Sequence, residues 1–105
     1  MTLYIVKAKP ISDRLTKLRK ELDSGDVSKL QPFGEALHQS LLEARIESEL
    51  DGSYAYWVEE DYCSPPLAME RQSVLDRYFK DISVEPVNSR EEGQSRIKGR
   101  KSLWD

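Results

Sequence analysis

The sequence predicts an α+β fold with the element order β-αα-β-β-α-β and an antiparallel sheet. Three observations support this prediction. A continuous apolar run at residues 3–6 is typical of a buried strand, two helical patterns then follow one another without a strand between them, and residues 53–60 alternate with the period of two of a strand that leads into a helix start. With 105 residues, 38% of them hydrophobic, the chain can bury one small core.

The first strand and the first helix are expected within residues 3–22. The run Leu-Tyr-Ile-Val at residues 3–6 is followed by lysines and a proline, which suits a central strand that is buried on both faces. Apolar residues then recur at the spacing of one helix face, at Ile11, Leu15, Leu18 and Leu22. Polar residues and a glycine at residues 23–26 predict the end of this helix.

A second helical pattern starts with Pro32 at the first helical position, and two interpretations of its end compete. Residues 45–50 alternate polar and apolar side chains and precede Asp51-Gly52, a pair typical of a two-residue hairpin turn. Either the helix stops near Glu43 and residues 45–50 pair with residues 53–60, or the helix continues through them and the sheet has three strands. We favour the hairpin, because a three-stranded sheet would leave the apolar helix faces short of partner surface.

The last helix and the last strand follow residues 53–60. Ser64 stands directly before two prolines, so its hydroxyl predicts the start of a helix. The buried stripe of this helix is assigned to Leu67, Arg71, Val74, Leu75, Tyr78 and Phe79, and its solvent side to Glu70, Arg77 and Lys80. Residues 81–87 alternate again and predict the final strand.

All helices are expected on one face of this sheet, because crossover connections fold back onto a sheet with a fixed hand. Tyr4 and the aromatic residues of the strand at 53–60 would then leave an apolar surface on the opposite face. Such a surface predicts a homodimer that packs sheet to sheet. The alternative is that the C-terminal tail covers this face with Ile97, Leu103 and Trp104.

The order of elements, with a last strand that ends in Val-Glu-Pro-Val, resembles that of the dimeric α+β barrel proteins, which are built on the ferredoxin-like fold. The resemblance covers residues 1–88 and implies a ferredoxin-like sandwich that dimerises. It rests on element order, so it carries no catalytic residue over to this chain. That superfamily includes small monooxygenases, isomerases, decarboxylases and proteins that only bind, so the resemblance does not choose among these activities.

Charge and composition restrict location and partners. The net charge of the chain is −3, which divides into −5 for residues 1–88 and +2 for residues 89–105. The body therefore lacks the basic footprint of a nucleic-acid-binding protein, and nucleic acid is not an expected partner. One cysteine excludes paired-cysteine zinc motifs. No apolar run approaches the ~20 residues of a membrane span. We therefore expect a soluble cytoplasmic protein with no membrane association, metal or cofactor.

Residues 89–105 are expected to form a second segment, a flexible basic tail. They are polar, interrupted by glycine and nearly free of periodicity, and they carry five basic and three acidic residues. Basic residues alternate with apolar anchors between Arg96 and Trp104. The tail could therefore contact the acidic body of a second subunit, which is the favoured interpretation, an acidic partner protein or, least expected, nucleic acid.

The candidate catalytic residues are His38, Glu59 and Tyr56. His38 is the single histidine, and a histidine beside a carboxylate can act as a general base near neutral pH. Glu59 belongs to the acidic run Glu59-Glu60-Asp61 at a strand end, where neighbouring negative charge raises proton affinity or a hard cation binds. Adjacent strand residues point to opposite faces, so at most two of these three acids can converge.

The candidate ligand-binding residues are Tyr54, Trp57, Tyr62 and Arg71, together with Tyr56. The aromatic side chains could line a cleft between helix and sheet, in which the arginine orients a polar or anionic small molecule. Cys63 precedes the predicted helix start and is expected to be a small buried side chain rather than a reactive thiol.

Three functions are compatible with these patterns. The chain is expected to be a self-associating binding or assembly module. The alternatives are a cofactor-free dimeric barrel enzyme that acts on a small polar or anionic molecule, and an adaptor that captures partners through its basic tail. The sequence contains no glycine-rich phosphate loop and no metal-ligand spacing that would select the enzyme.

Overall fold

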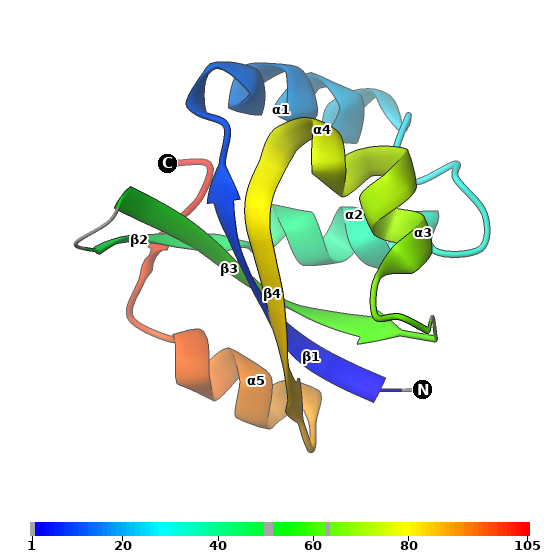
Figure 1. The fold of residues 1–105 in the computed structure, drawn as a ribbon. Coiled ribbons are helices and arrows are strands. Elements are labelled where there is room, and N and C mark those ends of the chain that lie inside the picture. Colours follow the sequence, from blue (N-terminus) through cyan, green and yellow to red (C-terminus); the bar gives the residue numbers. More distant parts are fainter. Residues whose placement is uncertain (1, 50–51, 63) are drawn as a thin grey trace.

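The computed structural model describes residues 2–49, 52–62 and 64–105, which form an α+β fold with a five-stranded antiparallel sheet and four helices (Figure 1). The strand order is β4-β1-β3-β2-β5. The elements are β1 (Thr2–Pro10), the 3₁₀ turn η1 (Ser12–Arg14), α1 (Leu15–Ser24), α2 (Gly34–Leu42), β2 (Arg45–Glu49), β3 (Gly52–Asp61), α3 (Ala68–Glu70), the π-helical segment η2 (Arg71–Leu75), α4 (Asp76–Tyr78), β4 (Phe79–Val87), α5 (Arg90–Ile97) and β5 (Lys101–Ser102). The segments α3, η2 and α4 are continuous and make one helix.

The sheet confirms the predicted hairpin and the predicted central position of the first strand. β1 pairs antiparallel with β3 on one side and with β4 on the other. β2 pairs antiparallel with β3, from Arg45 opposite Tyr56 to Glu49 opposite Gly52. The second helix therefore ends before residue 45, as the favoured interpretation has it, although it begins at Gly34 and not at Pro32.

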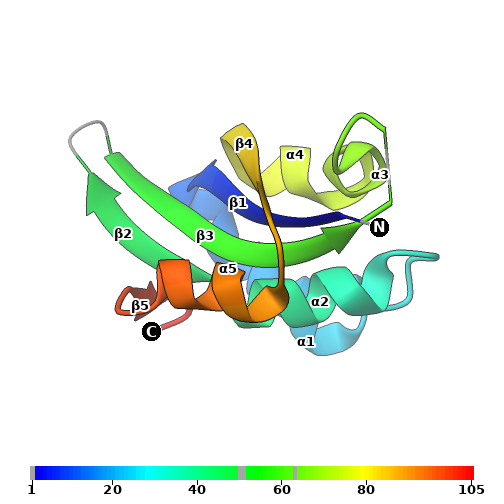
Figure 2. The same ribbon diagram turned by 90° about the horizontal axis from the view of Figure 1, so that it is seen from below.

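The main core lies between the sheet and α1, α2 and the helix of residues 68–78. From the sheet it receives Val6, Ala8, Ala55 and Trp57, and these pack against buried residues of all three helices. Figure 2 shows the strong curvature of β2 and β3 in this sheet. Trp57 is fully buried, and its ring centroid lies 5.1 Å from that of Phe79. Alternation along β3 thus assigns the odd-numbered residues from 55 onward to the helix-covered face.

The expectation that all helices lie on one face is wrong, because α5 packs on the other face. There Ile97 joins Ile5, Tyr54, Tyr56, Val58 and Val87 in a second apolar cluster. Gly93 makes this approach possible, because a Cβ atom at this position would lie 2.7 Å from Cγ2 of Val58. Ser89 caps the helix by accepting a hydrogen bond from the backbone N–H of Glu92, which the sequence analysis did not anticipate.

The C-terminal residues divide between the two clusters. Ile97 covers the aromatic face, as the alternative to dimerisation proposed, but Leu103 packs into the main core instead. The indole N–H of Trp104 donates a hydrogen bond of 2.7 Å to the carbonyl of Leu41. Residues 90–97 and 101–102 thus form a helix and a strand where the sequence suggested a tail without regular structure; the flexibility of this segment and its separation from the body stay predictions.

Basic side chains of residues 89–105 form ion pairs with acidic side chains of the same chain. Arg90 pairs with Glu60 of β3, Arg96 with Glu85 of β4, and Arg100 with Glu47 of β2. These basic side chains therefore meet the acidic body of their own chain, whereas the predicted contact with a second subunit stays a prediction.

The helix after β3 does not begin at Ser64. It begins at Ala68, and Leu67 before it has a φ of 62°. The backbone N–H of Leu67 donates a hydrogen bond of 2.7 Å to Oδ2 of Asp61, so a carboxylate six residues upstream takes the part that was predicted for the serine hydroxyl. The prolines between them form the connection to the helix.

The π-helical segment η2 changes which residues of this helix are buried. Its hydrogen bonds include one from the backbone N–H of Asp76 to the carbonyl of Arg71, five residues back. Residues five apart then share a face, so Glu70 lies on the side of buried Leu75. Glu70 is buried and Arg71 is exposed, which reverses the sequence-based assignment of both residues.

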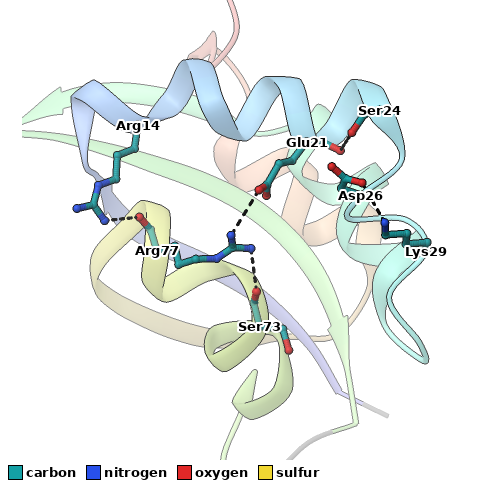
Figure 3. A network of polar contacts seen from close by, with 7 residues as sticks. All are labelled: Arg14, Glu21, Ser24, Asp26, Lys29, Ser73 and Arg77. Carbon is teal, nitrogen blue, oxygen red and sulfur yellow. Dashed lines mark hydrogen bonds and ion pairs between the residues drawn. The ribbon is translucent and has the colours of Figure 1, made fainter.

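Arginine side chains fasten the far end of this helix to α1 (Figure 3). The guanidinium of Arg77 donates to the carbonyl of Ser73 at 3.0 Å and to Oε1 of Glu21 at 3.4 Å. Arg14 in turn donates to the carbonyl of Arg77 at 2.9 Å. Two of these bonds, from Arg77 to Glu21 and from Arg14 to the carbonyl of Arg77, join α4 to α1 and η1.

No helix among the described residues has the length and apolar character needed to cross a membrane.

Candidate functional site

Three carboxyl groups meet where the end of β3 faces α3. Glu59 and Asp61 lie on the same face of the strand, and Glu70 comes from the helix. Their exposed fractions are 1%, 4% and 2%, so none of the three is in ordinary contact with water. Glu60 points away and its Oε2 lies 3.9 Å from Nη2 of Arg90, so the convergence of two acids out of three along the strand is confirmed.

Neutral donors and shared protons hold these carboxyl groups. The indole N–H of Trp57 donates a hydrogen bond of 2.8 Å to Oε1 of Glu59, and the N–H of Leu67 donates to Asp61. Glu70 is hydrogen-bonded to both Asp61 and Glu59. A hydrogen bond between two carboxyl groups needs a proton on one of them. The cluster therefore keeps protons in its folded arrangement.

Burial raises the pKa of two of these groups toward neutrality. It raises the pKa of Glu59 to about 8, assisted by the charge of Glu70 and opposed by the hydrogen bond from Trp57. It raises the pKa of Glu70 to about 7, assisted by the hydrogen bond to Asp61 and by the charge of Asp61. Carboxyl groups that titrate near pH 7 in a buried position are typical of functional sites as well as of structural networks.

A pocket of about 380 Å³ opens directly over this cluster. Its lining comes from α2 and the two residues before it, from the end of β3 and the residue after it, and from α3. These residues are Pro32, Phe33, Ala36, Glu60, Asp61, Tyr62, Met69 and Glu70. Tyr62 is 76% exposed and Met69 39% exposed. The pocket therefore combines an apolar wall and rim with two buried carboxyl groups, and Glu59 lies behind them.

The predicted aromatic cleft does not form, because its residues belong to opposite faces of β3. Tyr54 and Tyr56 lie in the cluster under α5, whereas Trp57 lies in the main core. The hydroxyl of Tyr56 donates a hydrogen bond of 2.6 Å to Oε1 of Glu49, and Glu49 also pairs with Lys7. Tyr56 is thus part of a polar network on the face away from the pocket.

The other candidates are also dispersed. His38 is half-buried on α2 and is not part of the pocket lining. Arg71 is exposed and pairs with Asp76 on its own helix. Tyr62 alone among the predicted ligand-binding residues lines the pocket, and Glu59 alone among the predicted catalytic residues belongs to the carboxyl cluster. Cys63 lies outside the described residues.

Sequence reasoning found one strand of this site and missed the helix that completes it. The pair Glu59 and Asp61 is visible in the alternation along β3. Glu70 was assigned to the solvent side as a charged residue. It lies three residues after Leu67 and four before Val74, the spacing of one helix face, and this spacing is the signal that could have placed it in the interior.

Two other possibilities at the surface have less support. Among residues 2–49, 52–62 and 64–105, no group of three or more histidine, cysteine, aspartate or glutamate side chains is arranged to hold a metal ion. A larger hollow of about 540 Å³ is lined by Lys9, Lys80, Asp13 and Ser53 among others, but none of these polar side chains is buried. The pocket over the carboxyl cluster is therefore the better candidate site.

Comparisons of this chain with protein-family models, with curated proteins and with solved structures give no match.

Proposed function

We propose that this protein is a small-molecule-binding module whose ligand enters the pocket over Asp61 and Glu70. The observation that carries the proposal is the combination of two buried carboxyl groups with an apolar wall and the exposed side chains of Tyr62 and Met69 in one pocket. A pocket that is mainly apolar and contains a few converging polar groups is the usual form of a small-molecule site.

The chemistry of the pocket favours a cationic ligand. Its polar residues are Asp61 and Glu70, with Glu60 and Tyr62 at the edge, and no lysine, arginine or histidine of the described residues lines it. An ammonium group would donate hydrogen bonds to the carboxylates and replace the protons that they otherwise share. An aromatic or aliphatic part of the same ligand would contact Phe33 and Met69. The expectation of a polar or anionic ligand thus becomes the proposal of a small amine.

Three probes of the same shape test this proposal. Benzylamine, benzyl alcohol and benzoate present a cation, a neutral hydroxyl and an anion on one aromatic ring. The methyl group of Met69, labelled with ¹³C, reports binding by its chemical shift. Benzylamine should bind with a Kd on the order of 1 mM, as expected for a ligand of this size, and the other two should bind at least tenfold more weakly.

A matched pair of variants completes this test. Glu70→Gln keeps the shape of the side chain but removes its charge, so it should weaken benzylamine binding several-fold and leave benzyl alcohol binding unchanged. Glu91→Gln makes the same chemical change at an exposed position on α5 and should alter neither. Equal binding of all three probes, or tighter binding of benzoate, is incompatible with a cation pocket.

A second candidate is an enzyme that transfers protons, favoured by the pKa of about 7 at Glu70 on the pocket wall. A general base works best when its pKa is near the working pH. Aminoacetone carries an ammonium group beside a carbonyl, and the loss of its C–H protons to D₂O can be followed by ¹H NMR. Exchange that the protein accelerates and that Glu70→Gln abolishes supports this candidate; exchange at the buffer rate removes it.

We also propose that residues 1–88 have the ferredoxin-like arrangement. The order β4-β1-β3-β2 with antiparallel neighbours supports it, while β5 and α5 are additions. The homodimer stays a prediction with reduced support, because α5 occupies the sheet face on which it was based. Native mass spectrometry distinguishes monomer from dimer. A reducing, cytoplasmic location, expected from the single cysteine, is part of the same proposal.

A further inference from the structure

The pocket over Asp61 and Glu70 has a wall and a rim of aromatic, aliphatic and thioether side chains. Phe33, directly before α2, is half-buried and packs against the main core, so its ring is held in place. Met69 of α3 is 39% exposed and contributes a flexible, polarisable thioether to the rim. A group bound beside the carboxyl groups therefore contacts these apolar side chains as well.

Tyr62 is the second aromatic ring of the pocket, and a hydrogen bond links it to the end of β3. Its hydroxyl donates to Oε1 of Glu60 at 3.4 Å, and Oε2 of Glu60 lies 3.9 Å from Nη2 of Arg90. The side chain is otherwise 76% exposed. Because the face of an aromatic ring attracts a cation within about 6 Å of its centre, Phe33 and Tyr62 offer two such faces from different parts of the chain.

The buried carboxyl groups of the pocket already have hydrogen-bond partners. Asp61 accepts a bond of 2.7 Å from the N–H of Leu67, and Glu70 is hydrogen-bonded to both Asp61 and Glu59. A bound cation must therefore compete with these partners for each N–H that it brings out of water. An unmethylated ammonium group brings three such donors, and a donor that finds no acceptor weakens binding. A methyl group in place of an N–H needs no acceptor and contacts the apolar wall.

We propose that the ligand of this pocket is a methylated ammonium group, with one or two methyl groups and at least one N–H on its nitrogen. The N–H donates to the carboxyl groups of Asp61 and Glu70. The methyl groups, which share the positive charge, contact the rings of Phe33 and Tyr62. The inference rests on the proposed function and deepens it by naming the class of amine. Because a primary ammonium has too many donors and a quaternary ammonium has none, affinity should pass through a maximum between them.

Four probes on one aromatic ring test this expectation. Benzylamine, N-methylbenzylamine, N,N-dimethylbenzylamine and benzyltrimethylammonium differ only in the methyl groups on nitrogen, and all four are cations at pH 7. The ¹³C-labelled methyl group of Met69 reports each Kd. The two intermediate compounds should bind about twofold to fivefold more tightly than benzylamine, the size of effect expected from contact between a cation and aromatic rings. The quaternary compound should bind at least threefold more weakly than N,N-dimethylbenzylamine.

Two variants of Tyr62 test the part played by its ring. Tyr62→Leu removes the ring and should at least halve the advantage of N,N-dimethylbenzylamine over benzylamine. Tyr62→Phe keeps the ring, loses only the hydroxyl that donates to Glu60, and should retain the advantage. The side chain is largely exposed, so both variants should unfold at the temperature of the unaltered protein. An equal effect of the two substitutions contradicts contact between the ring and the cation.

A methylated ammonium group occurs in free amines and at the end of a methylated lysine side chain. N,N-dimethylbutylamine and the N-acetyl amide of dimethyl-lysine have the same end group and differ in the attached backbone. Binding of the lysine derivative at least tenfold more tightly identifies a protein side chain as the source, and equal or weaker binding identifies a free amine. Both results support the methylated ammonium group, provided that each compound binds more tightly than its unmethylated form; the reverse order overturns it.

The four probes separate failure of this inference from failure of the proposed function, and they need only the unaltered protein. Affinity that falls with each added methyl group overturns the inference, while binding of benzylamine leaves the proposed function standing. Affinity that rises through the quaternary compound also overturns it, because the N–H is then not needed. If none of the four binds, or if benzyl alcohol binds as tightly as they do, the proposed function fails and the inference fails with it.

Discussion

Replacement of Glu70 by glutamine should flatten the pH dependence of stability. In the folded protein the pKa of Glu70 is raised from 4.5 to about 7. The folded state therefore holds a proton that the unfolded chain releases. The contribution of Glu70 to the free energy of unfolding is thus fully present below pH 4.5 and is lost as the pH rises through about 7. Glutamine at this position has no proton to lose, so it removes this contribution to the slope.

The magnitude follows from the size of the pKa change. One pKa unit corresponds to about 1.4 kcal/mol, so the difference between 4.5 and about 7 corresponds to about 3 kcal/mol. Coupling to Glu59 and Asp61 makes this an upper value for the single residue. A domain of this size is stable by roughly 5–15 kcal/mol, so a change of this size is easily measured.

The assay is urea unfolding at pH 5, 6, 7 and 8, followed by tryptophan fluorescence. Between pH 5 and pH 8 the unaltered protein should lose more stability than Glu70→Gln does, by at most about 3 kcal/mol, and Glu91→Gln should keep the unaltered slope. Comparison across pH cancels any constant effect of the substitution on packing. Parallel pH profiles for the unaltered protein and Glu70→Gln would refute the assignment of shared protons to this cluster.

The remaining predictions concern packing and the ligand. Gly93→Ala should lower the free energy of unfolding by about 1–3 kcal/mol, because its Cβ would overlap Val58, while Ser95→Ala on the exposed side of α5 should change it little. Thermal unfolding measures both variants, and equal melting temperatures would contradict the close packing of α5. Trp57→Phe leaves Glu59 without its indole donor, so it should lower the free energy of unfolding by about 1–3 kcal/mol and raise the pKa of Glu59 further. Carbon-13 NMR of the side-chain carboxyl measures this pKa, and an unchanged value would show that the hydrogen bond is not formed. Benzylamine should bind more tightly at pH 8 than at pH 6, because the carboxyl groups are ionised at the higher pH. Isothermal titration calorimetry in buffers of different ionisation heat should show protons released on binding, and binding without proton release would place the ligand elsewhere.

The strands and the hairpin could be predicted from the sequence because their signals are local. Alternation along residues 45–50 and 53–60, with Asp51-Gly52 between them, made the hairpin one of two possibilities. The choice between them needed one argument about the whole fold, the partner surface that the apolar helix faces require. The central position of the first strand followed from its continuous apolar run alone.

The position of α5 could not be predicted from the sequence, because it depends on a contact between residues that are far apart in the chain. Gly93 reads as a helix breaker in sequence, yet it is the residue that lets a short polar helix approach Val58 of β3. The helix has few apolar residues of its own, so its amphipathic pattern is weak. Its docking depends on ion pairs and on one buried side chain, Ile97.

Half of the candidate site was predictable and half was not. Glu59 and Asp61 converge as alternation requires, but their partner Glu70 is a charged residue on the buried face of a helix, where charged side chains are rarely found. The helix start was misplaced for a similar reason: the acceptor is Asp61 on the strand, not the adjacent Ser64. Tertiary contacts determine both the burial of Glu70 and the start of the helix, whereas the sequence alone equally allowed an exposed Glu70 and a cap at Ser64.

The most direct test of the proposed site is the titration of side-chain carboxyl groups by ¹³C NMR, with and without benzylamine. Two glutamate resonances should titrate with midpoints near 7 and 8, and benzylamine should lower the midpoint near 7 whereas benzyl alcohol should not. If every glutamate titrates near its ordinary value, the buried proton-sharing cluster does not exist. If the two raised midpoints are present but benzylamine leaves both unchanged, the cluster is structural and the pocket above it is not a cation site.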